Sequence, residues 1–165
     1  MWKRFFGPHC QIVGLDIDPR CMELEEDQIA IRIGDQSDSS FLQEVIDEFG
    51  TPSVILDDGS HMMAAVLKSF GFLYPRMASD GVYFVEDMHT SYMSKYGGGT
   101  GRPGSFIEHA KGLIDELNAD WTQGAVPVSE FTRNTLSIHF YESCVVFERG
   151  RHLPKSVPKI GIPSF

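Results

Sequence analysis

The sequence predicts an α/β protein built on an open, mostly parallel sheet with helices on both faces and an antiparallel hairpin at its C-terminal end. Short apolar, β-branched runs alternate with amphipathic stretches, acidic residues follow several of these runs, and two strand-like runs near the end are separated by only two residues. The length of 165 residues corresponds to one ordinary domain that can bury a core.

The first half of the chain contains two expected strands and one expected helix. Residues 11–17 (QIVGLDI) and 29–33 (IAIRI) are short and apolar, as strands buried on both faces of a parallel sheet are. Residues 39–49 place apolar side chains on one face of a helix, which Gly50 and Pro52 should end.

The second half repeats the same alternation and then changes to a hairpin. The glycine-rich stretch 97–104 lacks a phosphate-loop pattern and predicts a flexible loop or lid, and residues 153–165 predict an extended tail. In chain order, the expected elements are strand 53–56, helix 62–73, strand 82–85, helix 105–118 and the hairpin strands 135–141 and 144–148.

Composition limits the partners of the protein. The net charge of −9 disfavours nucleic acid and anionic membrane surfaces. No apolar run reaches the length of a membrane span, and the N-terminus does not form a signal peptide. Cys10, Cys21 and Cys144 provide no disulfide framework, so we expect reduced, mostly buried cysteines in a cytoplasmic protein.

Acidic residues and a histidine follow the strand expected at 53–56. Asp57, Asp58 and His61 lie between this strand and the next helix. Capping of that helix by Asp58 or Ser60 would explain one acid, but it would not explain two acids and a histidine within five residues.

The strand expected at 82–85 ends in two further acids, Glu86 and Asp87. Because consecutive parallel strands are usually neighbours, four carboxylates should meet at one sheet edge, where they repel one another unless a cation compensates. A hard divalent cation, Mg²⁺ first, is the simplest compensation. In the alternative, the acids point into solvent, cap helices or pair with Lys95 or Arg102.

Two histidines accompany these acids. A metal would stabilise a substrate hydroxyl as its proton leaves, and a neutral His61 near a helix N-terminus could accept that proton. His89 has weaker support, and we place it beside the site or on a lid.

Acidic and polar residues also end the first two expected strands. Asp16 is placed as the acid that binds ribose hydroxyls in nucleoside-binding α/β folds. Asp35 and Gln36 could reach an adenine edge, or they could belong to a turn before a helix cap at Ser37 or Asp38.

The motifs IVGLDIDPRC, IGDQSD, ILDDGSHMM and GVYFVEDMHTSY together resemble the macrocin and mycinamicin sugar O-methyltransferases over about residues 1–152. These are class I S-adenosylmethionine-dependent enzymes with a Rossmann-like fold, and cephalosporin-hydroxylase-like proteins form a neighbouring group. The resemblance implies methyl transfer to a hydroxyl, on a sugar of a natural product or a polysaccharide. It also implies residue roles: Asp58, Glu86 and Asp87 as Mg²⁺ ligands, His61 as the base, Asp16 at the ribose of the cofactor, Asp35 and Gln36 at its adenine, and Asp57 at its methionine end.

The sequence departs from that family at its beginning. The family has an earlier, central strand with a glycine-rich loop for the methionine part of the cofactor, whereas only ten residues precede residues 11–17 here. Residues 1–152 are therefore expected to be a partial methyltransferase domain. The alternative is a non-catalytic module of the same fold that keeps a metal site and forms a homo-oligomer. A hydroxylase is a third reading, and the absence of a histidine-rich iron triad argues against it.

Overall fold

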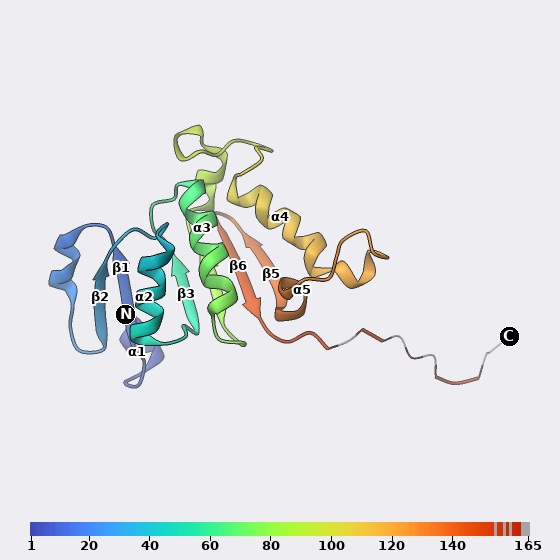
Figure 1. The fold of residues 1–165 in the computed structure, drawn as a ribbon, viewed down its shortest axis with the longest axis horizontal. Helices are drawn as coiled ribbons and strands as arrows, with labels where there is room; N and C mark the ends of the chain where they lie inside the picture. The colour runs from blue at the N-terminus through green and yellow to red at the C-terminus, as the bar shows by residue number, and fades with distance from the viewer. Residues whose placement is uncertain (154, 157, 159, 163–165) are drawn as a thin grey trace.

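The computed structural model describes residues 1–153, 155, 156, 158 and 160–162. Figure 1 shows the alternation of strands and helices along the chain, followed by an extended C-terminal segment. The strands are β1 (Ile12–Asp16), β2 (Ile29–Ile33), β3 (Val54–Asp57), β4 (Val82–Val85), β5 (Thr135–Tyr141) and β6 (Cys144–Arg149), and the α-helices are α1 (Trp2–Phe6), α2 (Ser39–Phe49), α3 (Met63–Leu73), α4 (Phe106–Leu117) and α5 (Glu130–Asn134).

The strands form two sheets. β1 pairs with β2 in parallel, and a second sheet has the order β3-β4-β6-β5, in which β3 and β4 are parallel and the β5–β6 hairpin is antiparallel. The expected α/β class, its parallel pairs and its terminal hairpin are confirmed. β1 and β3 do not pair with each other, and Leu15, Val54 and Leu56 beside these strand edges are exposed.

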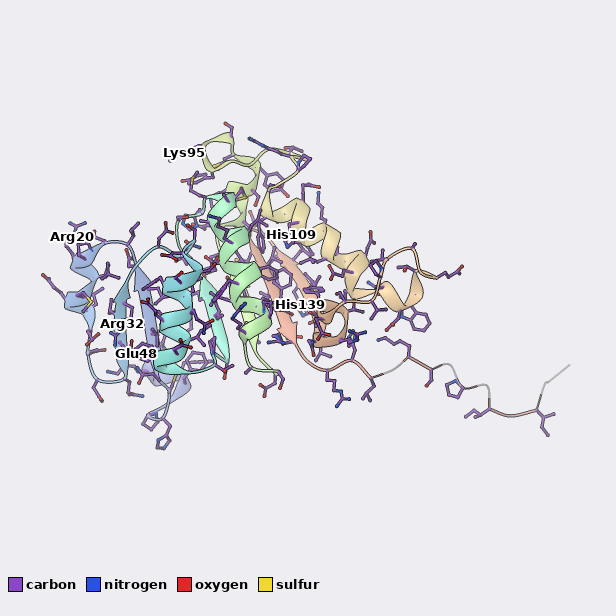
Figure 2. The ribbon with its side chains drawn as sticks, in the orientation of Figure 1. Arg20, Arg32, Glu48, Lys95, His109 and His139 are labelled. Atoms are coloured by element: carbon purple, nitrogen blue, oxygen red, sulfur yellow. The ribbon has the colours of Figure 1, made fainter. Side chains whose placement is uncertain are left out.

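Local sequence signals set both ends of α2, whose bounds match those of the expected helix at 39–49. Asp38 precedes α2, and its Oδ1 accepts hydrogen bonds from the backbone N–H of Ser40 at 2.9 Å and of Phe41. Gly50 ends the helix with a φ of 86°, a conformation that favours glycine. Arg32 of β2 donates to Glu48 of α2 at 2.8 Å, a contact between the helix and the neighbouring strand (Figure 2).

The described residues also form five short 3₁₀ helices and α5, which were not predicted from the sequence. α5 depends on a capping box in which the Ser129 hydroxyl accepts from the Thr132 N–H and the Thr132 hydroxyl accepts from the Ser129 N–H. A five-residue helix shows too little periodicity to stand out from a loop.

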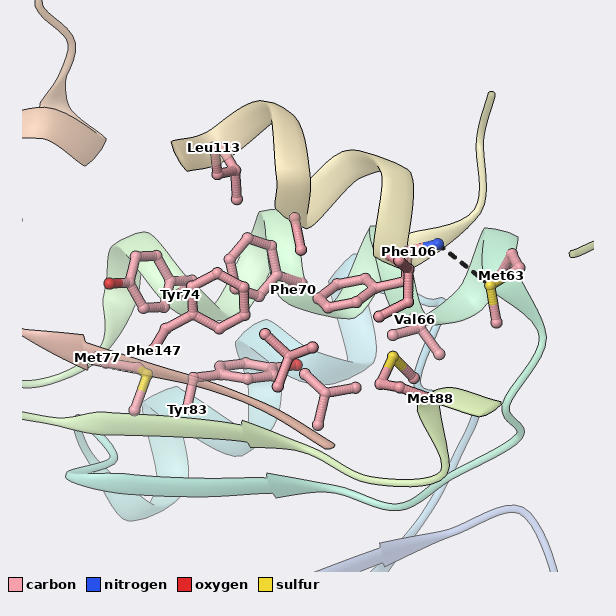
Figure 3. Close-up of a cluster of buried hydrophobic side chains, with 14 residues drawn as sticks. Met63, Val66, Phe70, Tyr74, Met77, Tyr83, Met88, Phe106, Leu113 and Phe147 are labelled. Carbon is pink, nitrogen blue, oxygen red and sulfur yellow. Dashed lines mark hydrogen bonds between the residues drawn. The ribbon is translucent and has the colours of Figure 1, made fainter. Parts of the chain in front are cut away.

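The core lies between helices α3 and α4 and one face of the four-stranded sheet. Figure 3 shows Phe70 of α3 between Phe106 of α4, Tyr74 and Phe147. The Phe70 ring centroid is 4.6 Å from that of Phe147 and 5.4 Å from that of Phe106. Such aromatic packing fixes α3, and with it the loop that precedes α3, against the sheet.

The opposite face of this sheet has little cover among the described residues. Strand alternation turns Ile55 and Asp57 of β3 toward the core, whereas Val54 is 52% and Leu56 is 42% exposed. Leu136 of β5 is 50% exposed.

The segment from Met88 to Gly104, which includes the expected flexible loop or lid at 97–104, carries several internal backbone contacts. Figure 1 shows it beyond the carboxyl end of β3. The Gly98 N–H donates to the Met93 carbonyl, the Gly99 N–H donates to the Ser91 carbonyl at 2.8 Å, and a Cβ at Gly98 would overlap that same Ser91 carbonyl. A glycine at position 98 is therefore required by close backbone packing.

The remaining sequence predictions concern the cysteines and the tail. The three cysteines are free and half-buried, which is less burial than expected. The described part of 153–165 contains no helix or strand, and residues 154, 157, 159 and 163–165 of this segment lie outside the described residues. None of the helices in the described part of the chain is long and apolar enough to cross a membrane.

Candidate functional site

The carboxyl ends of β3 and β4 bring the predicted acids to one place. Asp57 is paired with Val85 at the end of the parallel ladder, and the Glu86 N–H donates to the Asp57 carbonyl at 3.0 Å. The next positions along the two strands are Asp58 and Glu86, and Asp87 follows Glu86, so all three acids leave the sheet at the same edge. The inference from neighbouring strands was correct on this point.

Asp58, His61 and Asp87 form the centre of the candidate site. Each of these residues offers one ligand atom, and the three atoms lie within 4.8 Å of one another. His61 Nε2 is 3.8 Å from Asp87 Oδ2. Two carboxylate oxygens and one imidazole nitrogen at this separation are a donor set that fits a divalent cation.

Of the competing explanations for these acids, helix capping by Asp58 and pairing with Lys95 or Arg102 receive no support from the geometry, whereas Asp58 is exposed, as the solvent-facing alternative expects. Met62 is the N-cap residue of α3 and makes no side-chain capping hydrogen bond, so Asp58 does not cap this helix. Lys95 lies over the ring of Tyr96, and Arg102 donates to the Gly98 carbonyl. Within the described residues, neither of these cations forms an ion pair with the clustered acids.

Glu86, the third predicted metal ligand, lies near this group without belonging to it. Its carboxylate is not among the atoms that meet within 4.8 Å. Partial burial raises the pKa of Glu86, and the negative charges of Asp58 and Asp87 raise it further, while His61 acts in the opposite direction. The negative charges of Asp58 and Asp87 at this sheet edge therefore disfavour the ionised form of Glu86.

Two residues of the cluster hold left-handed backbone conformations. His61 has a φ of 56° and Asp87 has a φ of 52°, which is uncommon for residues other than glycine. The Asp87 carbonyl accepts from the Thr90 hydroxyl at 2.7 Å and from the Thr90 N–H at 3.0 Å, which stabilises this turn. Tyr96 packs its ring edge-on to His61, with centroids 6.3 Å apart.

His89, placed beside the site or on a lid, contacts the β5–β6 turn. Its Nδ1 is 2.6 Å from the Ser143 hydroxyl and 3.8 Å from Asp87 Oδ1. The Met88 N–H also donates to the Ser143 carbonyl at 2.7 Å. Sequence reasoning missed Ser143 and Tyr96, because their relation to the site depends on long-range folding.

Asp57 differs from its neighbour Asp58, because its carboxylate is buried and bonded to protein. Asp57 Oδ2 accepts from the Ser69 hydroxyl at 2.7 Å and from the Tyr83 hydroxyl at 2.9 Å. Asp57 Oδ1 accepts from the Gln36 amide at 3.0 Å. Burial and the Asp57 charge raise the pKa of Tyr83, so this phenol remains a proton donor.

The other residues assigned to the cofactor lie at the ends of β1 and β2. Asp16 is exposed and accepts from the Asp18 N–H at 2.8 Å. Asp35 is exposed and accepts from the Ser37 N–H at 2.7 Å, a hydrogen bond that lowers the pKa of its carboxyl. The turn with a cap at Asp38, one of the two readings of this segment, is present.

Comparison with known proteins supports one family. No family model matches the chain. Mycinamicin VI 2″-O-methyltransferase of Micromonospora griseorubida is 35% identical over 166 residues, which cover 96% of this chain and 40% of that enzyme. Demethylmacrocin O-methyltransferase of Streptomyces fradiae is 30% identical over 164 residues, which cover 96% of this chain and 41% of that enzyme.

The fold agrees with the sequence comparison. MycE methyltransferase of the mycinamycin biosynthetic pathway, solved in complex with Mg, SAH and mycinamycin VI, aligns with a TM-score of 0.83 at 33% identity. The alignment covers 96% of this chain and 42% of that chain. This chain is a homologue of the sugar O-methyltransferases.

The homologous region is only a part of those sugar O-methyltransferases. The chain spans about 40% of the length of the curated relatives it matches. A crystal form of MycE with Mg and SAH aligns over 99% of this chain with a TM-score of 0.84. The shared region therefore extends over nearly the whole length of the present chain. The Rossmann-like fold expected from the sequence is confirmed by these structures.

Proposed function

We propose that this chain provides the metal and acceptor-activating part of an S-adenosylmethionine- and Mg²⁺-dependent O-methyltransferase that acts on a sugar hydroxyl. The observation that carries the proposal is the meeting of Asp58, His61 and Asp87 within 4.8 Å at two adjacent strand ends. The solved MycE methyltransferase, with which this chain shares its fold, contains Mg and SAH.

In this proposal, Asp58 and Asp87 hold the metal directly, and Glu86 joins them by a side-chain rotation. Glu86 directly follows β4 and lies next to Asp87, within the electrostatic influence of Asp58 and Asp87, and a bound cation would compensate the charge of all three carboxylates. When bound, Mg²⁺ supplies charge that stabilises a developing alkoxide and fixes its direction.

His61 is the proposed base for the acceptor hydroxyl. Its side chain is 23% exposed, so a substrate can reach the ring, and Tyr96 limits its rotation. The imidazole takes the hydroxyl proton as the acceptor oxygen forms a bond to the transferred methyl carbon. The distance of 3.8 Å to Asp87 also fits a second role, in which His61 is itself a ligand, and the experiment below separates the two roles.

Asp16 and Asp35 are the residues proposed to contact the cofactor. Both are exposed at the carboxyl ends of parallel strands, where ligands of such folds bind. When bound, S-adenosylmethionine supplies a methyl sulfonium, whose carbon–sulfur bond breaks with the electron pair remaining on sulfur. We also propose that Gln36 and Asp57 lie near the cofactor, and their polar side-chain atoms bind protein partners in this structure.

The names of the relatives support the proposed acceptor, and the cysteines support the proposed location. Their acceptors are sugars on macrolides and tetracenomycins, so we propose a sugar hydroxyl on a natural product. We keep a cytoplasmic location as part of the proposal, because the three cysteines form no disulfide. A homo-oligomer remains a prediction.

The decisive experiment measures methyl transfer and metal binding together. The chain is incubated with S-adenosylmethionine, Mg²⁺ and mycinamicin VI as the probe acceptor, and S-adenosylhomocysteine is quantified. We expect turnover that chelation abolishes and that Asp58→Asn abolishes. The control His139→Ala, on the edge strand β5, which β4 and β6 separate from β3, should preserve turnover.

Binding titrations separate the remaining alternatives. If His61 is the base, His61→Ala removes turnover and leaves Mn²⁺ affinity nearly unchanged, whereas a ligand role would lower both. Mn²⁺ binding without any heat from S-adenosylhomocysteine would favour the non-catalytic module. Normal turnover in Asp58→Asn would refute the proposed chemistry.

A further inference from the structure

Gln36 reaches from the β1–β2 sheet to the loop that carries Asp58. It follows β2 in the chain, yet its side-chain amide donates to Asp57 Oδ1 at 3.0 Å and to the Ser69 hydroxyl at 3.2 Å. Its side-chain carbonyl accepts from the Ser60 N–H at 2.7 Å. The two ends of one amide group therefore bind the residues on both sides of the Asp58–Gly59 segment.

Gly59 makes this contact sterically possible. A Cβ at position 59 would overlap the Gln36 Oε1 atom. The φ of Gly59 is not in the positive range, so backbone conformation does not require glycine here. Close approach of the Gln36 side chain is the remaining physical reason for a glycine between Asp58 and Ser60.

The other carboxylate oxygen of Asp57 is fixed by the core. Ser69 of α3 and Tyr83 of β4 both donate to Asp57 Oδ2 and are 2% and 0% exposed, respectively. Asp57 is thus attached to a helix and a strand that cannot shift without disturbing the core. Gln36 completes the set of donors from the opposite side, across the boundary between the two sheets.

We propose that Gln36 and Asp57 are positioning residues that set where the Asp58 carboxylate stands relative to Asp87. Gln36 anchors the loop at Asp57 and at Ser60, so only Asp58 and Gly59 between these anchors can adjust. This inference rests on the proposed function, because it concerns metal binding at the same site. Gln36 thereby acts on the metal site, whereas its residue type and its place after β2 suggest a contact with the cofactor.

The expected size of the effect follows from other metal sites. Groups that orient metal ligands typically change metal affinity by about 10- to 100-fold when they are removed. Loss of the Gln36 hydrogen bonds frees the loop without removing any proposed ligand. The affinity for a divalent cation should therefore fall by about tenfold or more.

The experiment titrates Mn²⁺ into the full chain by calorimetry. Gln36→Met keeps the approximate size of the side chain and removes both hydrogen-bonding ends. Gln43→Met is the matched control, because Gln43 of α2 is half-buried and, within the described part of the chain, its side chain donates only to Asp47 on the same helix, at 2.8 Å. We expect weaker Mn²⁺ binding in Gln36→Met, wild-type binding in Gln43→Met, and similar circular dichroism spectra in both.

Gly59→Ala provides a second variant at an exposed position, where folding is less at risk. Its added methyl should displace Gln36 and weaken Mn²⁺ binding in the wild-type background, and it should have a smaller effect in the Gln36→Met background. The protection of the Ser60 N–H from hydrogen exchange should fall in both single variants.

The outcomes of these titrations separate a failure of the positioning role from a failure of the metal site. If the wild type binds Mn²⁺ and both Gln36→Met and Gly59→Ala bind it equally well, the positioning role is refuted and the metal site stands. If the wild type binds no Mn²⁺ at all, the metal site itself is refuted, and the positioning role falls with it.

Discussion

The hydroxyl of Tyr83 offers a measurable test of the buried network at the end of β3. Tyr83 is fully buried, and its hydroxyl donates to the Asp57 carboxylate at 2.9 Å. A hydrogen bond to a charged group is worth about 1.5–3 kcal/mol, and Tyr83→Phe removes this donor with almost no change in packing. Asp57 keeps its bonds from Ser69 and Gln36, so we expect a loss of about 2 kcal/mol in the free energy of unfolding.

Tyr74→Phe is the matched comparison. The Tyr74 hydroxyl lies 2.9 Å from the Thr135 hydroxyl, which is a neutral partner, and both residues are buried. A neutral hydrogen bond contributes about 1 kcal/mol, so Tyr83→Phe should cost about twice as much as Tyr74→Phe.

Urea denaturation followed by circular dichroism measures both variants against the wild type. The denaturant midpoint should fall while the slope stays constant, because the buried surface is unchanged. For a chain of this size, a loss of about 2 kcal/mol should also lower Tm by roughly 4–8 °C. Equal losses in the two variants would show that Asp57 carries no charge in the folded protein, or that the Tyr83 contact is not formed in solution.

Three further predictions concern stability. Burial raises the pKa of Tyr74 to about 12. The stability that this group contributes is therefore complete below its unfolded pKa of about 10 and is lost as pH rises toward about 12. Denaturation at pH 9, 10 and 11 should show a decline in the free energy of unfolding, and Tyr74→Phe should reduce this decline. Gly98→Ala should lower Tm, because its added methyl would overlap the Ser91 carbonyl. Gly112→Ala in α4 meets no atom and should stabilise the protein by about 0.5–1 kcal/mol. A calorimetric Tm of Gly98→Ala equal to or above that of Gly112→Ala would contradict the packing argument. Asp38→Ala should remove about 1 kcal/mol by loss of the α2 cap, and unchanged chemical denaturation would show that the cap is dispensable.

Much of the architecture could be read from local chemistry. The strand at 29–33 and the helix at 39–49 have the bounds that their apolar patterns, Asp38 and Gly50 indicate. The placement of Asp58 and Asp87 at one edge also followed from sequence, because both residues come after strands that are consecutive and parallel. Neither inference required knowledge of distant contacts.

The separate roles of adjacent acids could not be predicted from local sequence patterns. Asp57 and Asp58 are the same residue type in one motif, and only the orientation of β3 against α3 buries Asp57 and leaves Asp58 exposed. Likewise, Asp87 joins the cluster and Glu86 does not, and Asp87 adopts a left-handed backbone conformation at this point. A single sequence gives only a weak preference for such conformations, an enrichment at Asn, Asp and His, and does not tell which of these residues adopts them.

The sequence by itself determined the order of the strands and of the longer helices, because periodicity and capping act over a few residues. The rule that consecutive parallel strands are neighbours then indicated the sheet edge where the acids gather. Tertiary structure alone decided that Gln36 binds both sides of Asp58, that Ser143 contacts His89, and that β1 and β3 belong to different sheets. These features join residues that are far apart in the chain, and their geometry is set by how the layers pack around the core.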